Sequence, residues 1–250
     1  MNGELEGRSV IVTGAARGIG AAIAADLDRA GAERVAAGIA ERGGEARAFG
    51  VDVADRASVR ALVEGVAEAF GRLDVMFNNA GISKTLPFME TDEADFERIM
   101  RVNGLGVMIG TQEAARRMIA QGGGGKIVNT ASIAGKQGYP LFAAYCASKF
   151  AVVGLTQAAA RALAEHRITV NCFAPGVVRT ELWQQLDGEF MALGITQAAG
   201  QAIDDFSASI LAGRASLPAD IVGTTTFLAS SASDYITGQT LMVDGGMVLI

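Results

Sequence analysis

A tyrosine and a lysine four residues apart are the pair in this sequence best suited to acid–base chemistry. Tyr145 and Lys149 lie in the stretch 143–164, where alanine, leucine and apolar residues at steps of three and four predict one long helix. Residues four apart share a helix face. An ammonium group there favours phenolate over phenol, which predicts a pKa for Tyr145 below the usual value of about 10. Tyr145 is therefore a candidate general acid and base, although a surface lysine beside a half-buried tyrosine gives the same spacing.

A serine thirteen residues before Tyr145 is the second candidate for this chemistry. Ser132 follows by two residues a strand predicted at 126–130, which begins after the glycine turn at 122–125. Ligands bind at the carboxyl edge of open α/β sheets. Serine and tyrosine hydroxyls aimed at one oxygen suit a carbonyl that gains negative charge as it is reduced. His166 is the one histidine and ends the long helix, so we expect this chemistry to proceed without histidine.

A glycine-rich turn near the N-terminus is a candidate nucleotide site. Its sequence, GAARGIG at 14–20, joins a predicted strand at 9–13 to a helix expected to reach about residue 30. Glycines let the backbone turn tightly, and the N–H groups at a helix start favour a phosphate. The spacing differs from the G-x-G-x-x-G dinucleotide fingerprint, and a purely structural turn between strand and helix is the alternative.

Two further strand ends carry residues that suit a flat cofactor. Asp52 is placed at the carboxyl edge of a predicted strand, where its carboxylate can bond an adenine amine or simply hold a turn. The next strand along ends in NNAG at 78–81, whose small residues leave room for a ring system. Both features fall at the edge where ligands of open α/β sheets bind.

The remaining elements follow from periodicity and from turn residues. Asp55 is the expected N-cap of an amphipathic helix that Gly71 ends. Thr91 or Asp92 is expected to cap a long helix that carries Asn103. The full prediction adds strands at 48–53, 73–77, 168–174 and 240–243 and helices at 55–70, 91–120 and 221–228.

One element of the expected pattern is missing. A doubly wound sheet has a second strand after the first helix, ending in the residue that selects the ribose 2′ substituent. Here the twelve residues 33–44 look helical and lead directly into the strand expected at 48–53. We therefore predict an α/β fold whose second strand is lost or stunted.

Length and composition limit the remaining possibilities. With 250 residues, half of them apolar, the chain is expected to form one domain, with a lid at about 181–212 that carries Trp183. A net charge of −6 argues against nucleic-acid binding. The sequence has no signal-peptide pattern, no apolar run of roughly 18 residues and no metal-ligand spacing around its two cysteines. We expect a cytoplasmic protein that binds no metal and no membrane.

Together these motifs resemble the short-chain dehydrogenase/reductase family over the whole chain. They stand in the family's order: TGAARGIG at 13–20, NNAG at 78–81, Asn103, Ser132, Tyr145 with Lys149, and Pro175 with Gly176. The resemblance implies a Rossmann-type doubly wound parallel sheet, a nicotinamide cofactor, and hydride transfer at a carbinol or carbonyl carbon. It implies that Tyr145 is the acid and base, that Lys149 holds the nicotinamide ribose, that Ser132 bonds the substrate oxygen, and that Asn103 fixes a water in a proton relay.

The resemblance also implies a set of cofactor contacts along the sheet edge. The glycine turn would face the pyrophosphate, the region of Asp52 the adenine, and the residues after the strand at 168–174 the nicotinamide. The implied contacts are Gly14, Arg17, Gly18, Ile19, Gly20, Asp52, Val53, Asn79, Ala80, Gly81, Tyr145, Lys149, Pro175, Gly176, Val178 and Thr180. NAD is the expected cofactor and NADP stays open, because the selecting strand is missing.

The stretch PGVVRTELW at 175–183 and the ending VDGGMVLI resemble acetoin/diacetyl reductases (2,3-butanediol dehydrogenases) and polyol dehydrogenases. This implies a secondary alcohol, diol or polyol and its ketone as substrates. The implied substrate contacts are Ser132, Ile133, Tyr139, Tyr145 and Trp183, and the apolar Ile133 favours a less polar substrate than a polyol. The alternatives are a 3-oxoacyl-thioester reductase that uses NADPH and a non-catalytic cofactor-binding regulator.

Assembly into a homotetramer is a further expectation. The helices around 94–120 and 145–165 have more apolar residues than one inner face can use, among them Met108, Ile109, Phe150 and Val153. The resemblance implies packing through these two helices.

Overall fold

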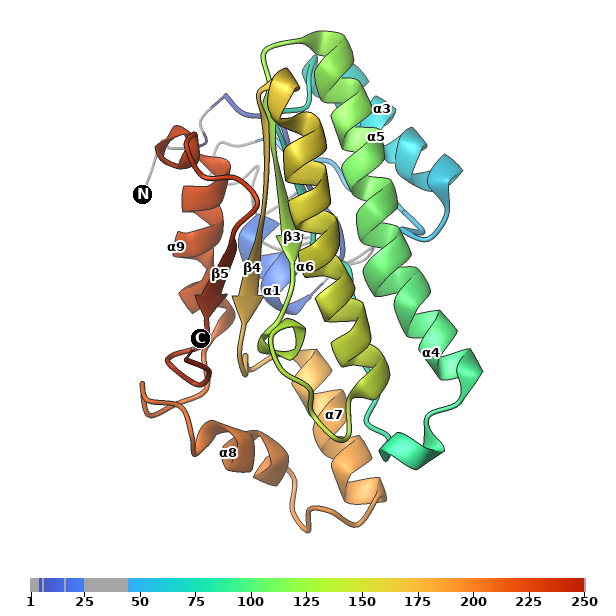
Figure 1. Cartoon of the computed structure of the whole chain (residues 1–250), viewed down its shortest axis with the longest axis vertical. Helices are drawn as coiled ribbons and strands as arrows, with labels where there is room; N and C mark the ends of the chain where they lie inside the picture. The colour runs from blue at the N-terminus through green and yellow to red at the C-terminus, as the bar shows by residue number, and fades with distance from the viewer. Residues whose placement is uncertain (1–4, 6, 16, 25–44, 250) are drawn as a thin grey trace.

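A parallel sheet forms the centre of the protein, in a computed structural model that describes residues 5, 7–15, 17–24 and 45–249. In these residues the sheet has five strands, which lie side by side in chain order (Figure 1). They are β1 (Val10–Val12), β2 (Val75–Asn78), β3 (Gly125–Thr130), β4 (Ile168–Pro175) and β5 (Thr240–Val243). The register aligns Asn78 with Asn129 and Asn129 with Cys172, so the carboxyl ends meet at one edge.

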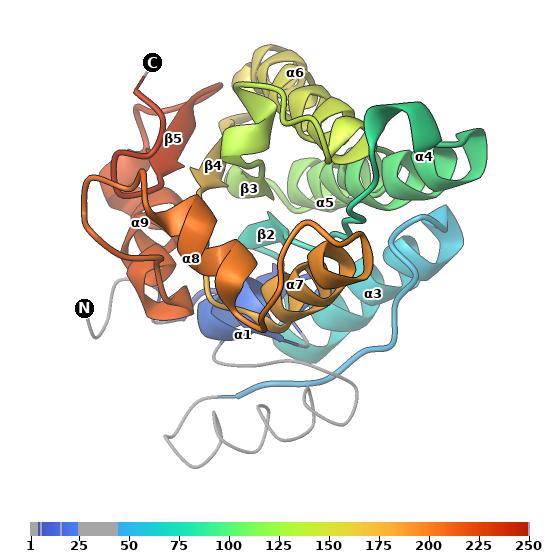
Figure 2. The ribbon, with the colours of Figure 1, turned by 90° about the horizontal axis from the view of Figure 1, so that it is seen from below.

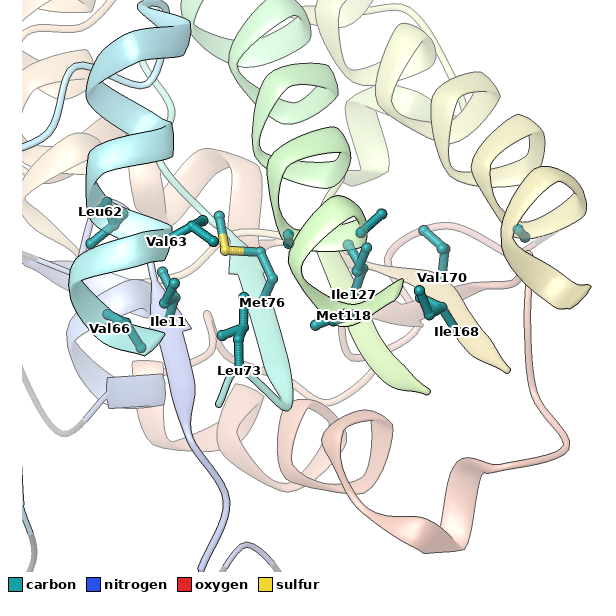
Figure 3. Close-up of a cluster of buried hydrophobic side chains, with 13 residues drawn as sticks. Ile11, Leu62, Val63, Val66, Leu73, Met76, Met118, Ile127, Ile168 and Val170 are labelled. Carbon is teal, nitrogen blue, oxygen red and sulfur yellow. The ribbon is translucent and has the colours of Figure 1, made fainter. Parts of the chain in front are cut away.

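Helices cover both faces of this sheet because its strands are apolar on both sides. Figure 2 shows α3 (Arg56–Phe70), α5 (Gly106–Gln121) and α6 (Ala143–Leu163) over one face and α1 (Gly18–Ala24) and α9 (Pro218–Ala229) over the other. On β2, Met76 packs under the first group, while Val75 and Phe77 pack under the second. Figure 3 shows the first cluster, in which strand residues such as Ile11 and Ile127 meet helix residues such as Val63. Full burial of one such side chain stabilises the fold by about 1.5–3 kcal/mol.

The helix predictions are confirmed where local capping decides them. α3 begins after Asp55, whose carboxylate accepts the N–H of Ala57 at 3.0 Å, and it ends at Gly71 with a φ of 81°. The long helix capped by Asp92 comprises α4 (Glu93–Met100), a π-helical turn (Arg101–Leu105) and α5. Asn103 lies in the π-helical turn, a feature that the periodicity did not predict.

The prediction of a strand at 48–53 is wrong. Residues 45–52 run without sheet pairing, and Val53 belongs to the turn before α3. In a doubly wound sheet the third strand pairs with the second and not with the first. Within the described residues nothing pairs with the outer edge of β1, and a cavity of about 550 Å³ separates that edge from residues 45–51. The predicted helix at 33–44, and with it the lost strand, lies outside the described residues.

The segment expected as a lid contains two helices, α7 (Glu181–Ala192) and α8 (Gln201–Ser207). They lie beyond the carboxyl ends of the strands (Figures 1 and 2). Leu186 and Phe190 of α7 pack with Ala202 of α8 and with Phe142, and this cluster attaches the segment to the body of the protein.

The apolar residues proposed as surplus divide between core and surface. Ile109 is buried within the described chain, so its inclusion among the surplus residues was wrong. Met108 and Val153 are half-buried, whereas Phe150 on α6 is exposed. In the described part of the chain, no helix is both long and apolar enough to cross a membrane.

Candidate active site

The carboxyl edge of the sheet gathers the residues that the sequence singled out. Gly14 follows β1, Asn79 follows β2, Ser132 follows β3 and Gly176 follows β4. Parallel strands all end at the same edge, so motifs far apart in the chain become neighbours. α6 packs against β4 and against the turn after Ser132, which places Tyr145, near the helix start, over the same edge.

Ser132 and Tyr145 form a hydroxyl pair. Ser132 caps a short helical turn (Ile133–Gly135), since its Oγ accepts the N–H of Ala134 at 3.1 Å. A Cβ on Gly135 would lie 2.8 Å from the carbonyl oxygen of Lys149, so this turn lies directly against α6. The hydroxyl groups of Ser132 and Tyr145 lie close to each other and line the same cavity. Two hydroxyl groups thus converge where a substrate oxygen could accept from both.

The pKa of Tyr145 moves in the opposite direction from the prediction. Burial raises it from 10.0 to about 12, and the neighbouring Ser132 hydroxyl offsets only part of that rise. The residue keeps partial access to solvent, but protein atoms surround the phenol densely enough to disfavour its charged form. In the cofactor-free protein Tyr145 is therefore a protonated phenol at neutral pH, ready to donate its proton.

The lysine does not offset this effect because of where its ammonium lies. Lys149 Nζ lies 5.5 Å from the centre of the Tyr145 ring and donates to the carbonyl oxygen of Thr130 at 2.7 Å. Burial lowers the pKa of Lys149 from 10.5 to about 8, so the group remains mostly charged at neutral pH. An ammonium has three donors. Among the described residues Lys149 makes one such bond, and its remaining donors suit the hydroxyl groups of a ribose.

Asn103 ties the loop after β2 to α6. Its Oδ1 accepts the N–H of Ile82 at 2.9 Å, and its Nδ2 donates to the carbonyl oxygen of Ile82 at 2.9 Å and to Ser148 Oγ at 3.0 Å. Ser148 Oγ in turn donates to the carbonyl oxygen of Tyr145 at 2.7 Å. Both amide donors of Asn103 are thus used by protein groups. The water relay stays a prediction, and its water would bond the second lone pair of Asn103 Oδ1 or a backbone carbonyl of the π-helical turn.

The glycine turn is packed against the end of β2. Gly14 has a φ of 62°, and a Cβ there would lie 2.5 Å from the Cα of Ala80. Asn79 Nδ2 donates to the carbonyl oxygens of Thr13 at 3.1 Å and Gly14 at 3.3 Å, while Thr13 Oγ1 accepts the N–H groups of Asn79 and Ala80. Only glycine fits this conformation and contact, so Gly14 lies directly against the end of β2.

The turn is also close to the start of α7. A Cβ on Gly18 would lie 3.1 Å from Thr180 Cγ2, and Arg17 and Gly18 line a cavity of about 760 Å³ together with Arg179 and Trp183. Gly20 is buried against Asn79, and Ile19 packs in the core cluster beneath α9. These residues offer backbone N–H groups at the start of α1 and positive charge beside them, which suits a pyrophosphate.

Asp52 acts as a turn residue in the structure. Its Oδ1 accepts the N–H of Ala54 at 2.9 Å, and its own N–H donates to Ser58 Oγ at 3.0 Å. Val53 is buried against Gly106. The adenine contact of these two residues stays a prediction.

A small cavity of about 70 Å³ lies next to the hydroxyl pair. All five predicted substrate contacts line it, and Tyr139 receives a hydrogen bond from Gln137 Nε2 at 2.7 Å. Trp183 packs edge-on against Phe206, with ring centres 5.4 Å apart. The cavity is lined by Ser83, Ser132, Ile133, Ala134, Tyr139, Phe142, Tyr145, Gly176, Val177, Leu182, Trp183, Leu186 and Phe206. Val178 and Thr180 lie just beyond it and are joined by a hydrogen bond from Thr180 Oγ1 to the carbonyl oxygen of Val178.

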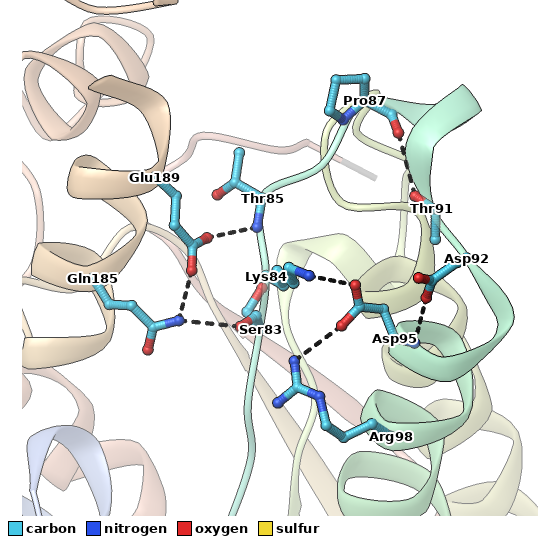
Figure 4. Close-up of polar contacts among 10 residues, drawn as sticks. All are labelled: Ser83, Lys84, Thr85, Pro87, Thr91, Asp92, Asp95, Arg98, Gln185 and Glu189. Atoms are coloured by element: carbon cyan, nitrogen blue, oxygen red, sulfur yellow. Dashed lines mark hydrogen bonds and ion pairs between the residues drawn. The ribbon is translucent and has the colours of Figure 1, made fainter. Parts of the chain in front are cut away.

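A polar contact between α7 and the loop after β2 was not predicted from the sequence. Glu189 Oε2 accepts the N–H of Thr85 at 2.6 Å (Figure 4). Gln185 Nε2 donates to Glu189 Oε1 at 2.8 Å and to the carbonyl oxygen of Ser83 at 3.4 Å. Thr85 and Glu189 are 104 residues apart in the chain, and no local pattern links them. Ser148 was also missed, although its place on the buried face of α6 was a usable signal.

Comparison with known proteins identifies similar chains over nearly the full length. Residues 8–189 match the family model described as short chain dehydrogenase. The chain is 40% identical to an L-2,3-butanediol dehydrogenase of Corynebacterium glutamicum, an alignment that covers 95% of this chain and 97% of that protein. It is 39% identical to a diacetyl reductase, (S)-acetoin forming, of Staphylococcus epidermidis, with 96% and 98% covered.

A solved structure extends this likeness to three dimensions. It is that of a candidate NAD(P)-dependent gluconate 5-dehydrogenase from Beutenbergia cavernae, with NADP bound at low occupancy. The identity is 39%, the TM-score is 0.83, and 98% of each chain is covered.

Proposed function

The chain belongs to the short chain dehydrogenase family, and from this membership we propose that it interconverts a small diol or hydroxyketone and the corresponding ketone. As a member of this family it is an oxidoreductase that acts on CH–OH groups with a nicotinamide cofactor. The observation that carries the proposal is the hydroxyl pair of Ser132 and Tyr145, which lines a small, mainly apolar cavity.

Each polar residue of the site has a proposed part. Tyr145 delivers a proton to the substrate oxygen during reduction, and Ser132 donates to the same oxygen as negative charge develops there. Lys149 holds the ribose of the cofactor, and Asn103 fixes the loop and α6 relative to each other. A bound nicotinamide supplies or accepts the hydride. Proton transfer of this kind contributes roughly 10²–10⁴-fold to the rate.

The cofactor is proposed to lie along the sheet edge, from the glycine turn to the end of β4. A dinucleotide fits the ammonium donors of Lys149 that have no partner in the described part of the chain, the close turn at Gly14 and the N–H groups at the start of α1. We propose NAD as the preferred form, on the resemblance to the acetoin and diacetyl reductases. The contacts follow the set predicted from the sequence, from Gly14 through Thr180.

The lining of the cavity favours a small substrate of moderate polarity. Its walls carry apolar side chains such as Ile133, Leu182 and Leu186 beside the hydroxyl pair. Acetoin, diacetyl and butane-2,3-diol have two oxygens each, whereas a hexitol has six and would bury more hydroxyl groups than this lining can bond. The assembled hydroxyl pair disfavours a regulator without turnover.

The remaining features of the proposal concern the whole protein. We propose that residues 181–212 form a lid over the substrate cavity within a single domain, since Leu182, Trp183, Leu186 and Phe206 line that cavity. We also propose that the protein forms a homotetramer and is located in the cytoplasm. The exposed Phe150 on α6 supports the proposed assembly.

Titration with NADH and NADPH, followed by turnover with diacetyl and acetoin, tests the proposal. We expect tight binding of NADH, oxidation of NADH on adding either ketone, and a loss of roughly 10²–10⁴-fold in kcat for Tyr145→Phe with unchanged cofactor binding. Turnover that survives in Tyr145→Phe would contradict the assignment of the proton donor. Preference for NADPH would contradict the cofactor assignment alone.

A further inference from the structure

Ser83 is a buried residue of the active-site cavity whose hydroxyl has no evident structural task. The residue is only 3% exposed, and its Oγ has no hydrogen-bond partner among the described residues. A buried hydroxyl without a partner costs roughly 1–3 kcal/mol, and such groups are rare in native proteins. Ser83 also lines the cavity shared by Ser132 and Tyr145. A ligand in this cavity is therefore the natural partner of the Ser83 hydroxyl.

The backbone around Ser83 is fixed from two sides. Asn103 accepts from and donates to the preceding residue, Ile82, at 2.9 Å in both bonds. On the other side, Gln185 donates to the carbonyl oxygen of Ser83, and Glu189 accepts the N–H of Thr85 at 2.6 Å (Figure 4). A donor held in this way loses little conformational entropy when it binds a ligand, so its bond contributes more to affinity and orientation.

The other walls of the cavity supply few polar groups. Ile133, Val177, Leu182 and Leu186 are apolar, and the hydroxyl of Tyr139 already accepts a bond from Gln137. Ser132 and Tyr145 converge on the oxygen that reacts. Within the described residues, Ser83 is then the buried hydroxyl of the lining that has no protein partner, and besides Tyr139, whose O–H remains free to donate, it is the hydroxyl available for a second oxygen.

We propose that Ser83 is a specificity-determining residue that hydrogen-bonds the oxygen on the carbon next to the reacting carbon of the substrate. It selects α-hydroxyketones, vicinal diketones and vicinal diols over simple ketones and alcohols of the same size. The inference rests on the proposed function and goes further by assigning recognition of the second oxygen to one residue. It follows from two observations. The Ser83 hydroxyl lines the cavity without a partner in the described part of the chain, and hydrogen bonds to neighbouring residues hold the backbone around it.

The test compares substrates that differ by one oxygen. Acetoin carries a hydroxyl that butan-2-one lacks, and the two are otherwise alike. We expect Ser83→Ala to lower kcat/KM for acetoin by roughly threefold to tenfold and to leave kcat/KM for butan-2-one within twofold. An equal loss for both ketones, or no loss for acetoin, would overturn the assignment.

Thr85→Val is the matched control. Thr85 is likewise 3% exposed, its Oγ1 also has no partner among the described residues, and it belongs to the same loop but not to the lining of the cavity. The ratio of the two kcat/KM values should stay at the wild-type value in this variant. Cofactor-free Ser83→Ala should unfold at a denaturant concentration no lower than wild type, because no internal bond is lost; a clear loss of stability would indicate a structural partner and contradict the proposal.

Failure of the proposed function can be told apart from failure of this inference. A wild-type protein that reduces neither ketone contradicts the proposed reaction. The Ser83 assignment is then decided by equilibrium binding of butane-2,3-diol and butan-2-ol to the complex with NAD. The wild type must prefer the diol and Ser83→Ala must lose that preference; equal binding of both alcohols by the wild type overturns the inference.

Discussion

At the scale of single residues, burial controls the charge states of the proposed acid–base pair. Burial raises the pKa of Tyr145 to about 12 and lowers that of Lys149 to about 8. The neutral form of each side chain is therefore more favourable in the folded protein than it is for the same side chain in water. The phenol therefore stays protonated until a positive charge arrives beside it. The oxidised nicotinamide carries such a charge, and its binding would favour the phenolate in the alcohol-oxidising direction.

Removal of the buried ammonium should change how stability depends on pH. The pKa of Lys149 is about 8 in the folded chain, against 10.5 for a free lysine, so the unfolded chain holds more protons between these pH values. Stability of the cofactor-free wild type therefore rises with pH through this range, by on the order of 3 kcal/mol from this group. Lys149→Met lacks this contribution. Denaturant unfolding of both proteins at several pH values should show the difference moving in favour of wild type between pH 8 and 10.5.

A difference between the two proteins that is constant over this range would contradict the buried charge. The slope of unfolding free energy on denaturant should be the same for both proteins, so that the comparison concerns stability and not compactness.

At the scale of elements, the site depends on how helices are joined to loops. The π-helical turn directs Asn103 inward, where it bonds Ile82 and Ser148 and so links the loop after β2 to α6. α7 is joined to the same loop through Glu189 and Gln185. The loop at 82–85 is therefore held by two helices, and it carries one wall of the substrate cavity.

Loss of the contact between α7 and this loop should affect the substrate more than the cofactor. Glu189→Ala removes the acceptor of the Thr85 N–H, a bond to a carboxylate worth roughly 1.5–3 kcal/mol. We expect KM for acetoin to rise about tenfold and the Kd for NADH to change less than twofold. Met191→Ala, at an exposed position of the same helix, is the control and should leave both constants unchanged. A parallel rise in Kd for NADH would mean that the contact supports the whole site.

At the scale of the whole molecule, two helices present apolar surface that the core does not use. Phe150 on α6 is 48% exposed and Phe96 on α4 is 43% exposed. α4 and α6 pack against each other, so these two rings belong to neighbouring helices on one side of the protein. Exposed aromatic residues on adjacent helices are typical of subunit interfaces.

Charge placed on this side should prevent assembly of the proposed tetramer. Phe150→Glu would bury a carboxylate without a partner in the interface, so we expect smaller species in sedimentation velocity at concentrations where wild type is tetrameric. Leu211→Glu replaces a residue that is 73% exposed in the segment proposed as a lid and should leave the sedimentation coefficient unchanged. A monomeric wild type, or a tetrameric Phe150→Glu, would contradict the proposed interface.

Several features could be predicted from the sequence because they depend on local chemistry. The bounds of α3 follow from Asp55 and Gly71, and those of α6 from its alanine- and leucine-rich periodicity. The order of the motifs placed Gly14, Asn79, Ser132 and Gly176 at successive strand ends, and parallel strands bring such ends together whatever lies between them. Backbone hydrogen bonds, caps and glycine conformations depend on a few neighbouring residues, which a sequence displays directly.

Contacts between distant segments, in contrast, were decided only by the tertiary structure. The strand predicted at 48–53 has no pairing partner in the described residues, and propensity alone cannot supply one. The pKa of Tyr145 depends on how densely the phenol is surrounded, which outweighs a lysine four residues away. The unpartnered hydroxyl of Ser83 and the bond from Thr85 to Glu189 both depend on segments that meet only after folding. Burial and the satisfaction of polar groups are set by the whole fold, and for that reason no local pattern could reveal them.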